Sequence, residues 1–236
     1  MKDQYFGDVN DFRKYGLLRS LAIPNRLHLG VCWMLTDSDG RTDGSQLAYL
    51  ANPKKYRQND PQLFEWLREA VYNGERRVVR VEQGALLGSA CFQSEILTDC
   101  ERERDEYFTK CAALFAHCDL VFFDPDNGIE VPSTLRGRRN SRKYLYWEEL
   151  CSTLAAGPSV LIYQHFIREE RSGFIGRMTQ DIRQRTRAAA VFSFRTPNVL
   201  FLLAAQERHA AAFRGRIATI PSEWASDQIL ATEHAH

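Results

Sequence analysis

The most unusual polar stretch of the chain follows a short apolar run near its middle. Residues 120–123 are all apolar and lead directly into Asp124-Pro-Asp-Asn-Gly128. These residue types form turns, so a tight turn after a strand is one interpretation. In the other interpretation, the carboxylate and a rigid backbone carbonyl accept the two hydrogens of an exocyclic amine and orient its nitrogen toward an electrophile. Asp124, Pro125 and Asn127 are therefore candidate catalytic residues.

A second polar segment follows the apolar run at residues 29–36. It contains Asp37, Asp39 and Asp43 together with Gly40 and Gly44. A loop rich in turn-forming residues is the simplest interpretation. Three functional alternatives stay open: oxygen ligands for a metal ion, a phosphatase-type nucleophile at Asp37, and a cofactor loop in which the glycines permit close approach.

A third apolar run, at residues 159–163, is followed directly by Gln164 and His165. Because imidazole titrates near neutral pH, His165 is a candidate catalytic base or a metal ligand, although a hydrogen-bonded structural histidine fits equally. Ligands of open α/β sheets bind beyond the carboxyl ends of the strands. We therefore expect the polar segments that follow all three apolar runs to converge on one crevice.

A basic segment follows the Asp124 motif and lies close in sequence to Tyr144, Tyr146 and Trp147. No carboxylate interrupts it, so its positive charge is unbalanced along the chain. A solvated loop is one interpretation, and contact with the phosphates of a nucleic acid is the other. The candidate nucleic-acid-binding residues are Arg136, Arg138, Arg139, Arg142 and Lys143.

Composition limits the class of protein. The chain has 236 residues, of which 44% are hydrophobic and 26% charged, as expected of a globular domain and not of a disordered chain. The formal net charge is +1, which does not indicate a globally basic nucleic-acid binder but leaves room for a local basic patch. The 6 cysteines form no Cys-x-x-Cys pair, so we expect free and mostly buried thiols.

Apolar runs are too short for a membrane span. The longest, at residues 199–205, falls well below the roughly 20 residues that a membrane helix needs. The first residues include Lys2, Asp3 and Asp8, where a signal peptide needs an apolar stretch. These features predict a cytoplasmic protein without a membrane partner.

The elements that must position these residues follow from hydrophobic periodicity. Continuous apolar runs predict strands buried on both faces, and amphipathic spacing predicts helices between them. Strands are expected at residues 29–36, 78–81, 120–123, 159–163, 190–194 and 199–205. Helices are expected at residues 11–22, 45–75, 101–118, 146–156 and 173–187.

This alternation predicts an α/β fold. We expect a Rossmann-like, mostly parallel sheet sandwiched by helices, with an antiparallel last strand from the closing hairpin. A small helical insertion is expected after the first strand, at about residues 45–75. No linker separates two halves, so residues 1–236 are expected to form a single domain, and the last residues, 231–236, are expected to fray.

The order of these features resembles the Rossmann-like S-adenosylmethionine-dependent methyltransferases. The likeness is greatest to the ribosomal-RNA adenine-N6 methyltransferases of the large subunit. Their N-terminal motif Gly-Asn-x-Ala-Asp-Val-x-Lys-His is similar to residues 7–15, which begin Gly7-Asp8 and end Lys14-Tyr15. Their Asp-Pro-Pro-Tyr motif is similar to residues 124–127, with Asp126 in place of the second proline and Asn127 in place of the aromatic residue that stacks on adenine.

The resemblance implies roles for several residues. Asp124 and Pro125 would hold the target amine, and S-adenosylmethionine would be the cofactor. Lys14 would lie near the cofactor or the nucleic acid, and the loop after the first strand would line the methionine and ribose side. The implied cofactor-binding residues are Lys14, Asp37, Asp39, Gly40 and, for the ribose hydroxyls, Glu82 at the end of the 78–81 strand.

Three functions follow from these patterns. The first is methyl transfer from S-adenosylmethionine to a base amine in a nucleic acid. The second is a Mg²⁺-dependent phosphohydrolase or nuclease, in which the strand-end aspartates and His165 activate water. The third is a methyltransferase fold that has lost catalysis and acts as a binding module. In each case the sequence predicts that Asp37, Asp124 and His165 lie at one pocket.

Overall fold

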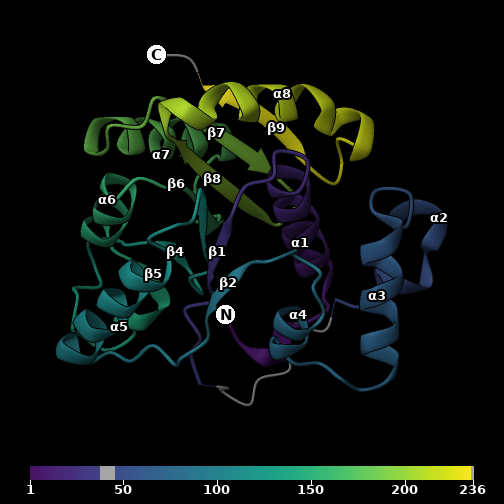
Figure 1. Ribbon diagram of the computed structural model, residues 1–236, viewed down its shortest axis with the longest axis horizontal. Helices are drawn as coiled ribbons and strands as arrows, with labels where there is room; N and C mark the ends of the chain where they lie inside the picture. Colours follow the sequence, from purple (N-terminus) through teal and green to yellow (C-terminus); the bar gives the residue numbers. More distant parts are fainter. Residues whose placement is uncertain (38–45, 235–236) are drawn as a thin grey trace.

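The computed structural model describes residues 1–37 and 46–234, and its centre is a seven-stranded sheet in the order β2-β1-β3-β6-β8-β7-β9 (Figure 1). A pair of short strands, β4 and β5, forms a separate ladder. The strands are β1 Leu29–Cys32, β2 Cys91–Gln93, β3 Leu120–Phe123, β4 Gly128–Ile129, β5 Tyr144–Leu145, β6 Ser159–His165, β7 Ala190–Arg195, β8 Val199–Ala205 and β9 Leu230–His234.

The strand directions confirm the expected Rossmann-like α/β class. Strands β2, β1, β3 and β6 are mutually parallel. Strand β8 lies between β6 and β7 and is antiparallel to both, so the closing hairpin supplies the expected antiparallel strand. Strand β9 adds to the edge of the sheet, antiparallel to β7. The carboxyl ends of β1, β3 and β6 therefore lie at the same edge of the sheet.

Helices cover both faces of the sheet (Figure 1). The helices are α1 Val9–Ala22, α2 Pro53–Tyr56, α3 Pro61–Tyr72, α4 Val79–Gln83, α5 Glu101–Leu114, α6 Trp147–Ala155, α7 Arg171–Arg185 and α8 Glu207–Glu223, with short 3₁₀ turns at Asp3–Tyr5, Ala48–Ala51 and Ser141–Lys143. One apolar cluster joins α1, α3 and α8 to the sheet, and a second joins α5, α6 and α7 to its other face.

Side-chain alternation explains why the strands are continuously apolar. In β3, Leu120 and Phe122 belong to the first cluster, whereas Val121 and Phe123 belong to the second. All four side chains are fully buried because each face of the sheet is covered by helices. The unbroken apolar run places the first polar residue, Asp124, at the carboxyl edge of the sheet.

One predicted strand is wrong. Residues 78–81 belong to the start of helix α4, and the strand next to β1 is β2, at Cys91–Gln93. Val78 and Val81 are both buried, and a spacing of three residues puts them on one face of a helix. In a strand, residues three apart would point to opposite faces. Glu82 therefore lies in a helix and not at the end of a strand.

The end of the chain also differs from the prediction. Residues 207–223 form α8, which was not predicted, and residues 230–234 form the edge strand β9 instead of fraying. The alanines of α8 give it only a weak apolar face, and most of the residues of β9 are polar or small. Helix α8 packs on α1, β8 and β9, and β9 pairs with β7 and contacts α8, so tertiary contacts fix both elements. Within residues 1–37 and 46–234, no helix is both long and apolar enough to cross a lipid bilayer.

Helix α1 packs closely against the end of α8 through a glycine. Gly16 lies in the middle of α1, and a β-carbon added there would overlap the indole ring of Trp224. Trp224 is almost fully buried and contacts the ring of Phe12, with 5.2 Å between ring centroids. Because Gly16 has no side chain, the indole ring of Trp224 has room to pack against α1 in the core.

We predict that Gly16→Ala destabilises the protein, although alanine has the higher helix propensity. Overpacking of a core costs about 1–3 kcal/mol, which exceeds the roughly 1 kcal/mol gained from helix propensity. Gly215→Ala in α8 is the matched control, because nothing lies within 4 Å of a β-carbon there. Urea unfolding should show a loss of stability for Gly16→Ala and none for Gly215→Ala. Equal stability of both variants would contradict the packing described.

Candidate functional site

A polar cavity of 380 Å³ opens at the carboxyl edge of the sheet, beyond β3 and β6 and against the start of α1. Its volume lies in the range of small-molecule sites. Of the expected convergent residues, the cavity brings together Lys14, Asp124, Pro125, Asn127, Lys143 and His165. The other lining residues are Met1, Lys2, Tyr5, Asp8, Asn10, Asp11, Gln46, Asp126 and Tyr163.

A buried lysine links the two motifs on which the family resemblance is based. Lys14 Nζ lies 2.7 Å from Asp124 Oδ2 and 2.8 Å from Asp11 Oδ1, and all three side chains are almost fully buried. Burial alone would lower the pKa of Lys14, but the two carboxylates raise it, so the ammonium stays charged. The ion pair joins residues 110 positions apart and fixes α1 against the end of β3.

Asp11 is held from several directions. Its second oxygen accepts hydrogen bonds from Tyr15 OH and from the backbone N–H of Gly7, both at 3.1 Å. Burial raises the pKa of the Asp11 carboxyl, and Lys14 opposes that rise. Gly7, Asp11, Lys14 and Tyr15 thus form one network that is local to the start of α1. This network gives each of those four residues a structural role at its place in the sequence.

Asp126 is held separately from Asp124. Its Oδ1 lies 2.9 Å from the Met1 amino group, and its Oδ2 accepts a 2.8 Å hydrogen bond from Thr36 Oγ1. Burial alone would raise the pKa of Asp126, but these two partners lower it. The same amino group donates to the backbone carbonyl of Asp124, at 3.1 Å. Asp126 therefore anchors the turn to the end of β1.

Gln164 fixes the other side of the turn. Its Oε1 accepts a 2.8 Å hydrogen bond from the Ile129 N–H, and its Nε2 donates to the Asn127 carbonyl at 3.3 Å. Gly128 has φ of 113°, and a β-carbon there would overlap the Gln164 amide. Asp124 and Asn127 are thus held in a rigid turn between β3 and β4, beside the end of β6. Gln164 is a positioning residue that sequence reasoning left without a role.

His165 and Tyr163 form the wall of the cavity along β6. Their rings meet edge to face with centroids 5.1 Å apart, and Tyr163 lies under the Lys14 ammonium at 5.1 Å. His165 is exposed at the mouth of the cavity, although the surrounding walls still lower the pKa of its imidazole. A neutral imidazole at pH 7 is able to accept a proton.

Asp8 caps α1 and faces the same cavity. Its Oδ1 accepts hydrogen bonds from the backbone N–H groups of Asn10, at 2.8 Å, and Asp11, at 3.0 Å. Burial, reinforced by the nearby Asp11 carboxylate, raises the pKa of Asp8 to about 7. The residue therefore changes charge in the neutral pH range. It was missed because an aspartate before a helix ordinarily indicates only a cap.

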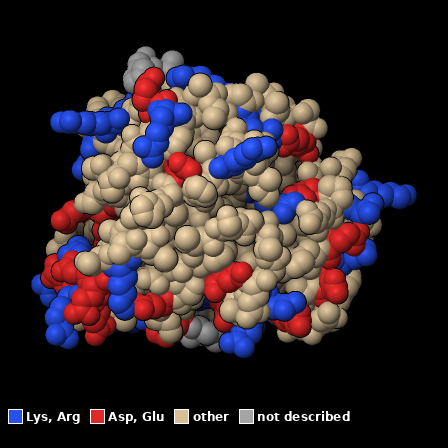
Figure 2. Space-filling model, in the orientation of Figure 1, with Lys and Arg blue, Asp and Glu red and all other residues tan. Residues whose placement is uncertain are grey.

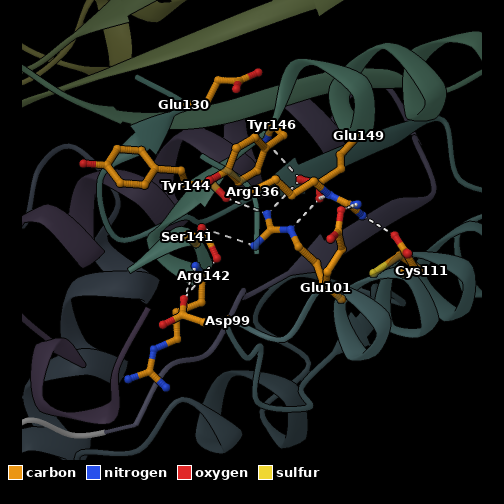
Figure 3. Close-up of polar contacts among 12 residues, drawn as sticks. Asp99, Glu101, Cys111, Glu130, Arg136, Ser141, Arg142, Tyr144, Tyr146 and Glu149 are labelled. Atoms are coloured by element: carbon orange, nitrogen blue, oxygen red, sulfur yellow. Dashed lines mark hydrogen bonds and ion pairs between the residues drawn. The ribbon is translucent and has the colours of Figure 1, made fainter. Parts of the chain in front are cut away.

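The basic segment is less unbalanced in space than along the chain. Arg136 contacts Glu101 and Asp105 of α5, and Figure 3 shows Arg136 and Glu101. Arg142 Nη1 lies 3.0 Å from Asp37 Oδ2. The fully buried Arg104 contacts Glu149 at 2.6 Å and donates to the carbonyls of residues 141 and 144, which holds this segment against α5.

One of the remaining positive charges of this segment lies at the cavity. Lys143 lines it, and Arg138 and Arg139 are exposed. On the face drawn in Figure 2, Lys and Arg are dispersed among Asp and Glu and do not form one continuous basic patch. The unbalanced run of the sequence is thus partly neutralised by carboxylates from α5, α6 and the end of β1.

Two expected cofactor residues have other partners. Asp37 pairs with Arg142 and is not part of the cavity wall. Glu82 Oε1 accepts hydrogen bonds from Trp33 Nε1, at 3.0 Å, and Ser94 Oγ, at 2.6 Å. Asp39 and Gly40 lie outside the described residues, as does Asp43. The expectation that Asp37, Asp124 and His165 line one pocket holds for Asp124 and His165 and fails for Asp37.

We predict that Asp8 makes the folded state less stable as the pH rises. Because its pKa is raised on folding, its stabilising contribution is complete below the ordinary value of 3.8 and is lost as the pH rises through about 7. Asp8→Asn keeps a capping side chain without the charge. The stability of Asp8→Asn relative to the natural protein should therefore rise by about 2–3 kcal/mol between pH 5 and pH 8.

Urea denaturation across this pH range measures the effect. Glu170→Gln is the control, because Glu170 caps α7 from an exposed position and its pKa is lowered by hydrogen bonds from the backbone N–H groups of Ser172 and Gly173. Its stability relative to the natural protein should be constant above pH 5. A constant difference for Asp8→Asn as well would contradict the assignment.

No protein-family model matches the chain, and no curated protein matches it significantly. A function is therefore assigned from the fold and the cavity.

Proposed function

We propose that this protein is a methyltransferase-like enzyme that transfers a methyl group from S-adenosylmethionine to a base amine in a nucleic acid. The observation that carries the proposal is the Lys14–Asp124 ion pair in the wall of the cavity. It brings the N-terminal motif and the Asp-Pro motif, which are separate in the sequence, into one site. The site lies at the carboxyl edge of a Rossmann-like sheet, where ligands of such sheets bind.

The residues around Asp124 suit an amine. The Asp124 carboxylate lies in the cavity wall, and the carbonyl of Pro125 follows it in a turn that Asp126 and Gln164 hold on two sides. Two acceptors at a fixed separation hold both hydrogens of an amine and direct its lone pair outward. His165, neutral at pH 7, is placed to take the proton that the methylated nitrogen loses.

Asn127 stands where the related motif has an aromatic residue. It lines the cavity, and its backbone is fixed by Lys143 and His165. An amide at this position holds a base by hydrogen bonds instead of stacking. The rings available for stacking in the cavity wall are those of Tyr5, Tyr163 and His165.

The cavity also fits the charged end of the cofactor. When bound, S-adenosylmethionine supplies a methyl group on a positively charged sulfur. The carboxylate of Asp8 suits a positive group, and Lys2 suits the carboxylate of the methionine moiety. Gln46, which lines the cavity, borders the segment that contains Asp39 and Gly40, and these two residues are proposed to contact the ribose side.

A nucleic-acid substrate is supported by a lysine in the cavity wall and by two exposed arginines that precede it in the sequence. Lys143 lines the cavity, and Arg138 and Arg139 are exposed on the loop that precedes it. We propose that these three residues contact phosphates, as the sequence predicted. Arg136 and Arg142 contribute less to this contact, because carboxylates already neutralise them.

The Mg²⁺-dependent alternative is less favoured by the same contacts. Asp124 and Asp126 are each held by a cationic group, Lys14 or the Met1 amino group. Over residues 1–37 and 46–234, no three His, Cys, Asp or Glu side chains are grouped so as to hold a metal ion. The third hypothesis, a binding module without catalysis, differs from the proposal only in the chemical step.

Methyl transfer from S-adenosylmethionine with a tritiated methyl group tests the proposal. The acceptors are an unmodified ribosomal-RNA transcript and denatured DNA, each digested to nucleosides and separated after the reaction. We expect label in an amino-methylated nucleoside. Asp124→Asn should reduce the rate by about a hundredfold or more, because the amine loses an ionic acceptor.

Asp227→Asn is the matched control, since Asp227 is exposed and pairs only with residues outside the cavity. Its rate should equal that of the natural protein. Binding of S-adenosylmethionine without transfer to either acceptor would favour the binding module. Failure to bind S-adenosylmethionine at all would overturn the proposal.

A further inference from the structure

We propose that Asp8 makes the cavity selective for a positively charged ligand, so that it binds the sulfonium S-adenosylmethionine in preference to the neutral thioether S-adenosylhomocysteine. This inference rests on the proposed function and assigns a specificity-determining residue within that site. Asp8 had no role in the sequence analysis or in the resemblance. The argument depends on how the carboxylates of the cavity are paired.

Asp8 differs from the other aspartates of the cavity wall in how its charge is balanced. Four aspartates line it: Asp8, Asp11, Asp124 and Asp126. Lys14 serves Asp11 and Asp124 together, and the Met1 amino group serves Asp126. Among the described residues, no cationic group forms an ion pair with Asp8, whose hydrogen bonds come from two backbone N–H groups. Lys2 and Lys143 also line the cavity, but within the described part of the chain Asp8 itself has no cationic partner in direct contact, so a cationic ligand can pair with it.

Helix capping does not require that charge. Asparagine caps a helix as well as aspartate does, and asparagine is the residue that the related N-terminal motif has at this position. A carboxylate placed in a largely buried wall beside Asp11 is costly when ionised. A cationic ligand removes this cost, because it supplies an opposite charge in contact with Asp8. Charge at Asp8 thus contributes to binding and not to the fold.

Asp8 lies next to a contact between the start of α1 and the segment that follows β1. The backbone N–H of Val9, the next residue, donates to the Gln46 carbonyl at 3.2 Å, beside the segment that follows β1. Asp124 and Pro125 line the same cavity, and Lys14 contacts Asp124 directly. In the proposed arrangement, the cationic sulfur lies at Asp8 and the amine at Asp124.

Isothermal titration of both compounds at pH 8 tests the inference. The natural protein should bind S-adenosylmethionine at least about tenfold more tightly than S-adenosylhomocysteine. Asp8→Asn should lose most of this preference by weakening the sulfonium alone. Asp8→Ser, which also caps the helix, is a second variant, and thermal melting verifies that both are folded. Asp227→Asn should keep the preference of the natural protein.

The outcomes separate the inference from the proposed function. If both compounds bind equally well, or if Asp8→Asn and Asp8→Ser keep the preference, the inference is overturned and the proposed function stands. If neither compound binds the natural protein, the proposed function is overturned and the inference with it. A preference that only the two Asp8 variants lose supports both.

Discussion

The site depends on one buried ammonium group that serves two carboxylates. Lys14 reaches from α1 to Asp11 on its own helix and to Asp124 at the end of β3, and none of the three is appreciably exposed. A buried charge without a partner costs several kcal/mol, so each member of this group stabilises the position of the others. The contact fixes how the first helix meets the sheet and forms one wall of the cavity.

The fold was largely predictable because its strands are buried on both faces. Such strands are unbroken apolar runs, and the predicted run at residues 120–123 coincides with β3. Where packing and not pattern decided the structure, prediction failed. Val78 and Val81 looked like part of a strand and form one buried face of a helix. Helix α8 and strand β9 are defined by the surfaces they cover, which a sequence does not display.

The site was predictable only in part. Asp124 and His165 were identified because polar residues at strand ends meet at one edge of a sheet. Asp8 and Asp11 were overlooked, since a helix start explains an aspartate without any ligand. The basic segment was overvalued, because the carboxylates that neutralise Arg136 come from α5, about 30 residues earlier in the chain. In both cases the partners lie far apart in the sequence: the cavity joins the start of α1 to the end of β3, and the ion pairs of Arg136 join it to α5.

A double-mutant cycle between Lys14 and Asp124 tests the central contact most directly. The free energy of unfolding is measured for Lys14→Met, Asp124→Asn and the double variant. Each single change should cost about 3–5 kcal/mol, because it leaves a buried charge without its partner. The double variant should be more stable than the sum of the two losses by at least about 1 kcal/mol. Losses that add to within about 0.5 kcal/mol would contradict the account.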